Sequence, residues 1–233
     1  MRDDLSSSRL NFGVIGAGRV GPIIGSALAS AGHKFLGITQ PSLKSRERVD
    51  LLLPGVNYSD SLTIINDSEL VILALPDSEL EDFVGGMSSQ NAWRAGQLVL
   101  HTSITHGLDV LNRAKKQGVI PISLYPLMEF TGTSLDFRKL QESWCVVSAP
   151  PVAEPIVSAL AVEMGMEPVT VDEEGRAHAA SAIALATSFF QTTIQESADR
   201  MKQAGVKDPG RVLHPLVLSL LENAFRTSLG EQT

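Results

Sequence analysis

Short, unbroken apolar runs alternate with helical patterns from the start of the chain to about residue 172. Strands that are covered on both faces are continuously apolar, so these runs predict the buried strands of a mostly parallel sheet. The helical patterns between them predict the crossover connections that parallel strands need. The expected strands are 12–15, 33–39, 70–75, 97–101, 118–124, 144–148 and 168–171, and the clearest helices are 42–52, 151–164 and the segments that follow residues 18 and 76.

The pattern changes at residue 173, after which no further strand is expected. Two long helical patterns follow, at 176–204 and 209–229, and the second carries a wide apolar face at helical spacing. We therefore expect a doubly wound, mostly parallel α/β Rossmann sheet in residues 1–172 and a small all-helical domain in residues 173–233. Because two helices cannot cover both of their apolar faces alone, we expect them to form a homodimer and to contribute to the substrate site.

A glycine-spaced turn follows the first expected strand. Its spacing is G-x-G-x-x-G, with an apolar strand before it and a helical stripe after it, which is the context of a dinucleotide site. Gly16 suits the tight turn, Gly18 lets the backbone approach a pyrophosphate, and Gly21 lets the helix pack on the strand. A turn that serves packing alone is the alternative. The predicted cofactor contacts in this turn are Gly16, Ala17, Gly18, Arg19, Val20 and Gly21.

The segment after the second expected strand indicates which dinucleotide is bound. Sites for NAD place a carboxylate about 20 residues beyond the glycines, where it holds the ribose 2′-hydroxyl. Here the strand ends in Thr39-Gln40, and hydroxyls and cations follow it. Because Arg, Lys and Ser suit a 2′-phosphate, the sequence favours NADP(H) over NAD(H). The alternative is that these cations form only the solvated face of a helix. The predicted contacts are Gln40, Ser42, Lys44 and Arg46.

Charge and composition exclude several classes of partner. The 233 residues carry a formal net charge of −7, which argues against nucleic acid and anionic membranes as partners. No apolar run approaches the roughly 18 residues of a membrane span. Residues 1–8 are polar and acidic, unlike a signal peptide. The single cysteine, Cys145, allows no intrachain disulfide and indicates a buried thiol in a reducing, cytoplasmic compartment.

Two strand ends carry the candidate chemistry. We expect Leu75 and Pro76, together with the loop 103–106, to face the nicotinamide, because ligands bind at the carboxyl ends of parallel strands. Ser103 is expected to orient a carbonyl or imine, and His106 to exchange a proton with it. The alternative for His106 is a structural role at the start of the helix that follows.

A second candidate histidine is His178, near the start of the first C-terminal helix. It is expected on the inward side of that helix, with Ala179, Ala180 and Ile183, either as a catalytic residue or as a satisfied buried histidine. No metal centre is expected, because the chain has neither C-x-x-C nor H-E-x-x-H and its histidines lack the spacing of a ligand pair on one helix face.

Two further segments carry a family resemblance. The loop that begins at Ser123 reads Ser-Leu-Tyr-Pro-Leu-Met-Glu-Phe-Thr-Gly, and the first C-terminal helix contains Ala-His-Ala-Ala-Ser at 177–181. With the glycine turn, they make the chain resemble the 6-phosphogluconate dehydrogenase-like superfamily, which includes β-hydroxyacid dehydrogenases and the ketopantoate and pyrroline-5-carboxylate reductases. More narrowly, the chain resembles a poorly characterised Rossmann-like oxidoreductase branch. The resemblance implies a Rossmann domain, a helical domain and a nicotinamide cofactor.

The expected function is that of an NADP-dependent oxidoreductase, which transfers hydride between nicotinamide and a small carbonyl or imine substrate. The alternative is a non-catalytic NAD(P)-binding sensor, or a degenerate relative that acts through its dimer. Departures from the family motifs favour the alternative, since Tyr125 stands where the relatives have a loop histidine and Ile104 replaces a glycine after Ser103. Turnover of a small-molecule substrate separates the two hypotheses.

Overall fold

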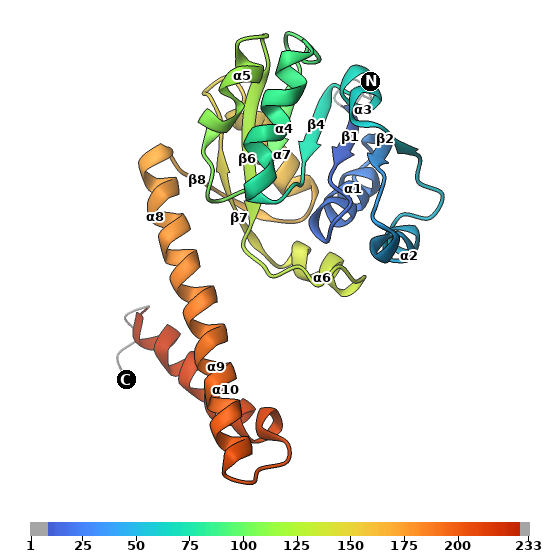
Figure 1. Ribbon diagram of the computed structural model, residues 1–233. Coiled ribbons are helices and arrows are strands. Elements are labelled where there is room, and N and C mark those ends of the chain that lie inside the picture. Colours follow the sequence, from blue (N-terminus) through green and yellow to red (C-terminus); the bar gives the residue numbers. More distant parts are fainter. Residues whose placement is uncertain (1–8, 229–233) are drawn as a thin grey trace, which may run out of the picture. The chain divides into compact units, whose positions relative to one another are not determined.

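The computed structural model describes residues 9–228, in two compact units that meet in the sequence between Ala179 and Ala180. The first is a sheet covered by helices and the second is all-helical, in agreement with the expected fold class (Figure 1). Leu229, the expected end of the last helix, lies outside the described residues.

The first unit contains an eight-stranded sheet in the order β3-β2-β1-β4-β5-β6-β7-β8. Every neighbouring pair is parallel except β6 and β7, so the mostly parallel prediction is confirmed. The strand order reverses between β1 and β4, which is where α/β sheets of this kind bind ligands. The strands are β1 Asn11–Ile15, β2 Lys34–Thr39, β3 Tyr58–Ser59, β4 Leu70–Leu73, β5 Leu98–His101, β6 Ile120–Pro126, β7 Trp144–Ser148 and β8 Glu167–Thr170.

Helices connect most of these strands, and several of the short ones were not expected from the sequence. The segment α3 begins at the N-cap Asp60, whose carboxylate accepts a hydrogen bond from the Thr63 amide at 3.0 Å. The helices of this unit are α1 Val20–Ser30, α2 Leu43–Leu52, α3 Ser61–Asp67, α4 Asp77–Ser89, the 3₁₀ turn η2 Leu108–Leu111, α5 Asn112–Lys115, α6 Leu135–Gln141 and α7 Glu154–Glu163.

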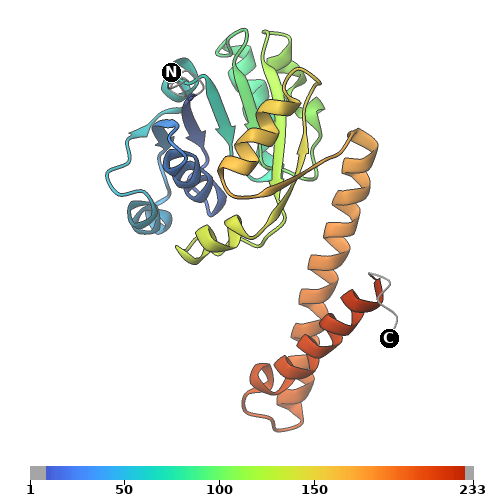
Figure 2. The same ribbon diagram turned by 180° about the vertical axis from the view of Figure 1, so that it is seen from behind.

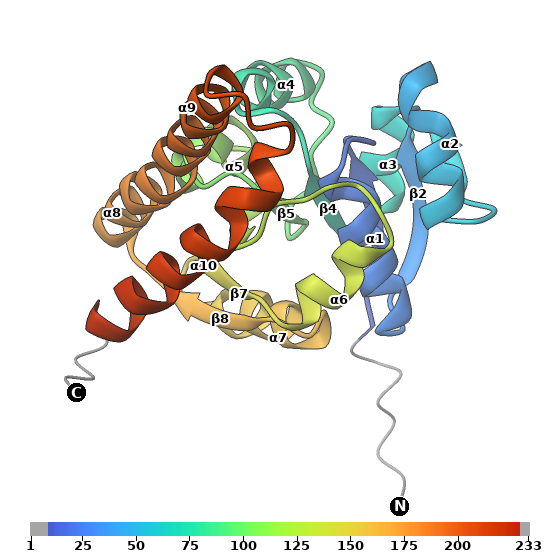
Figure 3. The same ribbon diagram turned by 90° about the horizontal axis from the view of Figure 1, so that it is seen from below.

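The sheet separates two hydrophobic cores. On β4, Leu70 and Ile72 pack into one core, whereas Val71 and Leu73 pack into the other. The side chains of a strand alternate between faces, so a strand with a core on each side is apolar throughout. Buried residues of α1, α2, α6 and α7 complete the first core, and those of α3, α4 and α5 complete the second. Figure 2 shows α1 and α7 in front of the sheet, and Figure 3 shows α4 and α5 on the opposite side.

The turn from β1 into α1 leaves no room for side chains at two of its glycines. Gly16 has a φ of +114°, and a Cβ built on it would lie 2.1 Å from the carbonyl oxygen of Ala74. A Cβ on Gly21 would lie 2.0 Å from the carbonyl oxygen of Gly16. A Cβ on Gly18, in contrast, meets nothing within 4 Å. The outer glycines are therefore required by packing, and the middle one is not.

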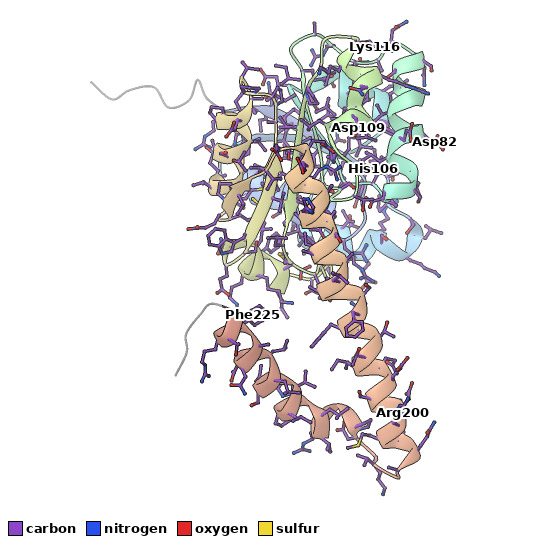
Figure 4. The ribbon with its side chains drawn as sticks, turned by 90° about the vertical axis from the view of Figure 1, so that its left-hand side faces the viewer. Asp82, His106, Asp109, Lys116, Arg200 and Phe225 are labelled. Atoms are coloured by element: carbon purple, nitrogen blue, oxygen red, sulfur yellow. The ribbon has the colours of Figure 1, made fainter. Side chains whose placement is uncertain are left out.

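The second unit consists of the end of one long helix and a second helix packed beside it. The long helix comprises α8 Glu173–Ala184, the π-helical turn η3 Leu185–Phe189 and α9 Phe190–Gln203, and α10 spans Pro209–Ser228. Both expected C-terminal helices are thus confirmed over the described residues. Figure 4 marks Arg200 near the end of α9 and Phe225 near the end of α10. Apolar side chains of α9 and α10 line a groove of about 300 Å³ within this unit.

The glycine turn generates a prediction about stability. Gly21→Ala forces a methyl group against the Gly16 carbonyl, and we expect it to lower the free energy of unfolding by about 2–4 kcal/mol. Gly18→Ala, which enters open space, is the matched control and should change the free energy by no more than about 0.5 kcal/mol. Urea unfolding of the two variants measures the difference. Equal midpoints would contradict the close backbone packing described here.

Candidate functional site

The glycine turn lies at the carboxyl end of β1, beside the end of β2. The Gly16 amide donates a hydrogen bond to Thr39 Oγ1 at 2.9 Å, which ties the two strand ends together. The N-cap of α1, Arg19, makes no side-chain capping hydrogen bond, so its side chain does not satisfy the first-turn amides. Helix N-termini of this kind attract anions. The open space beside Gly18 therefore fits the close approach of a phosphate group.

The end of β2 carries the residues that the sequence assigns to a ribose phosphate. Gln40 is exposed, and no carboxylate follows β2 before α2 begins. Ser42 takes the N-cap position of α2 and donates its hydroxyl proton to Ser45 Oγ at 3.1 Å. Lys44 is exposed on the first turn of the same helix. The absence of a carboxylate at this strand end suits a 2′-phosphate better than a free 2′-hydroxyl.

Arg46 has a partner that the sequence did not indicate. Its guanidinium carbon lies 5.3 Å from the centre of the Tyr58 ring on β3, within the range of a cation–π contact. The Tyr58 hydroxyl donates to Asp50 at 2.6 Å. Burial and the hydrogen bond to Asp50 raise the pKa of Tyr58 to about 12, so its phenol stays neutral and holds Arg46 against the edge of the sheet.

Arg48, two residues further along α2, contacts the glycine turn directly. Its Nη2 donates to the carbonyl oxygen of Gly18 at 3.3 Å. Gly132, in the loop after β6, packs against the same side chain, since a Cβ on that glycine would lie 2.9 Å from Arg48 Cδ. Sequence reasoning noted Arg48 only as one cation among several, because its contact with Gly132 joins segments far apart in the chain.

The ends of β4 and β5 meet in one hydrogen-bonded network. Ser103 Oγ accepts the backbone N–H of His106 at 3.0 Å. The His106 ring nitrogen Nε2 lies 3.0 Å from the carbonyl oxygen of Asp77, at the start of α4. These contacts bring the loop 103–106, in which Figure 4 labels His106, next to the segment that contains Leu75 and Pro76. The His106–Asp77 contact thus joins the two predicted strand ends. The Ser103–His106 contact, in contrast, lies within the loop after β5.

His101, the last residue of β5, lies beneath this network and is fully buried. Its Nδ1 accepts the backbone N–H of Ser103 at 3.3 Å, so its proton is on Nε2, which has no hydrogen-bond partner among the described residues. Burial lowers the pKa of His101 to about 4, with further lowering by His106 and Arg176 and an opposing effect of Asp77. The ring is therefore neutral at neutral pH and fixes the backbone of Ser103.

Arg176 is a site residue that the sequence analysis missed. It is buried in the first turn of α8, where Nη1 donates to the carbonyl oxygens of Ile104 and Thr105 at 2.8 and 2.9 Å. Its guanidinium also pairs with Glu173. Because a charged donor that bonds two carbonyls is worth more than a neutral one, Arg176 holds the loop beside His106 in place.

His178 lies on a different side of α8 from the one expected. The sequence analysis placed it on the inward side with Ala179, Ala180 and Ile183, but its side chain is exposed. The buried residue of this stretch is Arg176, and at 100° per residue the histidine two positions later lies on the opposite face. No hydrogen bond links His178 to Ser103 or His106 within residues 9–228.

Two further side chains bear on the chemistry. Tyr125, near the end of β6, is half-buried, and burial together with the charge of Asp77 raises the pKa of its phenol. It therefore remains a proton donor at neutral pH. Cys145 is free and buried, which confirms the expected buried thiol, and burial raises the pKa of that thiol to about 12.

Residues 9–228 contain no group of three or more His, Cys, Asp or Glu side chains arranged to hold a metal ion. Over the same residues, no helix combines the length and apolar character that crossing a membrane requires.

The fold and the glycine turn define a Rossmann-type α/β architecture, and a helical unit follows it in the sequence. The family model for the Rossmann-like domain matches residues 1–126. Because this match covers more than half of the sequence, the chain belongs to the Rossmann-like domain family. A second family model, for a domain of unknown function, DUF2520, matches residues 143–233. Comparison with the curated proteins finds no match.

Three solved structures illustrate the fold that the chain shares. A Bacteroides fragilis protein provisionally described as an NADP oxidoreductase is 19% identical, with a TM-score of 0.76 over 93% of this chain and 81% of that one. An imine reductase from a Pseudomonas species is 18% identical, with a TM-score of 0.67 over 96% and 77%. A reductive aminase from Aspergillus terreus, in complex with NADPH4, cyclohexanone and allyl amine, is 14% identical, with a TM-score of 0.71 over 95% and 76%. At these identities the similarity is one of fold.

His101 makes the stability of the protein depend on pH in a defined window. Burial lowers its pKa from 6.5 to about 4, so between these values the unfolded chain binds a proton that the folded chain does not. The stabilisation is complete above the unfolded pKa and falls by about 3 kcal/mol as the pH drops to the folded pKa. In His101→Gln, the loss of unfolding free energy from about pH 7.5 to about pH 4.5 should therefore be smaller. Urea unfolding measures it, and equal losses would contradict a neutral buried ring.

Proposed function

We propose that the protein is an NADP-dependent oxidoreductase that acts on a small carbonyl or imine substrate. The observation that carries the proposal is the open space beside Gly18, in a turn whose outer glycines, Gly16 and Gly21, are required by packing. The polar network at the ends of β4 and β5 lies at the same edge of the sheet. The similarity in fold to an imine reductase and a reductive aminase supports the same class of reaction. The substrate itself is identified only by this chemistry.

The residues of the first unit fit the two ends of the cofactor. The turn 16–21 suits the pyrophosphate, and Leu75 and Pro76 suit the nicotinamide end at the reversal of strand order between β1 and β4. At the end of β2, a 2′-phosphate would find the amide of Gln40, the hydroxyl of Ser42 and the cations Lys44 and Arg46. These residue types recognise phosphate, which is the basis for proposing NADP(H) over NAD(H).

The network at the ends of β4 and β5 can orient a substrate and supply its proton. When bound, NADPH would supply a hydride to the carbon of a C=O or C=N bond, which leaves a proton to be added at the oxygen or nitrogen. His106 donates through Nε2 to the Asp77 carbonyl, and its protonated form has a second N–H, at Nδ1, for a substrate. The Ser103 hydroxyl makes no donor bond to another described residue, so it can donate to the same group. His178 remains a candidate for the same role.

We also propose that the protein is a homodimer through its C-terminal helices. Large apolar side chains of this unit are exposed, among them Phe189, Val212 and Leu216 at 71%, 53% and 58%. Exposed apolar side chains of this kind are suited to burial against a second copy of the same helices. Light scattering at micromolar concentration should give a dimer, and a monomer whose mass does not change with concentration would contradict this proposal.

The catalytic proposal predicts the effect of single substitutions on turnover. With a panel of keto acids, imino acids and aldehydes, NADPH oxidation should identify at least one substrate. His106→Ala should then lower kcat about 100-fold or more, the range of general acid catalysis. Ser103→Ala and His178→Ala test the other two candidate residues in the same assay.

The control is Asp109→Asn, which alters an exposed residue three positions beyond His106 and should leave kcat unchanged. Figure 4 shows both residues. Unchanged rates in His106→Ala and Ser103→Ala would contradict the proposed site. Binding of NADPH without oxidation by any member of the panel would favour the non-catalytic sensor instead.

A further inference from the structure

A cavity of about 360 Å³, lined by both charged and apolar residues, lies between α2 and the loop after β6. One wall comes from α2, with Lys44 and Arg48 above the apolar Leu51 and Leu52, and the other comes from the segment 131–133. All of these residues belong to the first unit. The second wall is about 80 residues away in sequence from the first, so the pattern of the β2–α2 segment alone does not reveal the cavity.

Two cations line this cavity and a third lies beside its Gly132 wall, in a protein whose net charge is −7. Lys44 and Arg48 line it, and a Cβ on Gly132 would lie 3.3 Å from Arg19 Cγ. None of the three forms an ion pair within residues 9–228, and the Nε of Arg48 is buried without a hydrogen-bond partner there. Glu47 is the one carboxylate in the lining. Unpaired cations and an unsatisfied buried donor favour an anion as the occupant.

A buried carboxylate fixes the second wall. Asp136 is fully buried and accepts the backbone N–H groups of Thr131 and Gly132 at 2.9 and 2.7 Å. It also accepts the Thr131 hydroxyl proton at 2.8 Å. The proton shared by the hydroxyls of Thr131 and Thr133, 2.9 Å apart, is therefore that of Thr133. Rotation about one C–O bond would turn this proton towards an anion in the cavity.

We propose that this cavity binds a phosphate monoester, and that the loop 131–133 thereby takes part in selecting NADP(H) through its 2′-phosphate. The inference rests on the proposed function and extends it, because it adds Arg48 and Thr133 to the residues assigned from the β2–α2 segment. Lys44 and Arg48 supply the charge, and Thr133 supplies a hydroxyl donor. Asp136 is a positioning residue, since it holds the loop without facing the anion.

Calorimetry with fragments of the cofactor tests the proposal on the full chain. The probes are 2′,5′-ADP, which carries the phosphate monoester on the ribose, 5′-AMP, which lacks it, and inorganic phosphate. Thr133→Val keeps the shape of the side chain and removes its hydroxyl, so we expect it to weaken 2′,5′-ADP about tenfold. Lys44→Ala should weaken it by a similar factor, and both variants should leave 5′-AMP within about twofold of the unaltered protein.

Two matched controls accompany these variants. Ser134→Ala removes the next hydroxyl along the loop, and Lys139→Ala removes an exposed cation of α6; neither residue lines the cavity. Both should bind 2′,5′-ADP as the unaltered protein does. If Lys139→Ala weakens 2′,5′-ADP as much as Lys44→Ala does, the loss of affinity comes from the overall charge of the protein, and the proposal is overturned.

The outcomes separate this inference from the proposed function. If NADPH and NADH both bind and Thr133→Val weakens neither selectively, the loop has no part in selection and the inference is overturned while dinucleotide binding stands. If neither dinucleotide binds, the proposed function fails. Inorganic phosphate that binds as tightly as 2′,5′-ADP, and is not displaced by NADPH, would show an independent phosphate site and would also overturn the assignment.

Discussion

The close approach of backbone to backbone between β1, α1 and the end of β4 is the constraint on which the rest of the structure depends. The Gly16 carbonyl occupies the place of a side chain at residue 21, and the Ala74 carbonyl occupies the place of a side chain at residue 16. The Ala74 amide also donates to the Ile15 carbonyl at 2.8 Å, which closes β4 onto β1. With these atoms in contact, the N-terminus of α1 opens at the reversal of strand order, where ligands of such sheets bind.

The polar side chains around this opening are held by partners on other elements. Arg176 on α8 bonds the carbonyls of the loop after β5, and Asp136 on α6 bonds the amides of the loop after β6. The neutral ring of His101 accepts the backbone N–H of Ser103 and thereby fixes that residue. Because each loop is held by a buried group outside it, the candidate site is positioned before any ligand arrives, which is the arrangement that catalysis and selective binding favour.

The sequence predicts the parts of this structure that repeat locally. The buried strands and long helices follow from apolar runs and helical spacing, and the glycine turn follows from its motif. Periodicity did not indicate the short helices α3 and α6, nor did it give the direction of β7, which is set by pairing with β6. The helical pattern also placed His178 on the inward side of α8, whereas the buried residue of that stretch is Arg176 and His178 is exposed.

The residues that the sequence missed act across long separations. Arg176 meets a loop about 70 residues earlier, and Arg48 packs against Gly132. No local pattern marks such pairs.

The measurement that tests the central claim most directly is a paired titration of the unaltered protein with NADPH and NADH, monitored by calorimetry. We predict that NADPH binds at least about tenfold more tightly than NADH, because its extra phosphate adds a charged contact. Binding of neither would contradict it and leave the glycine turn with a role in packing alone.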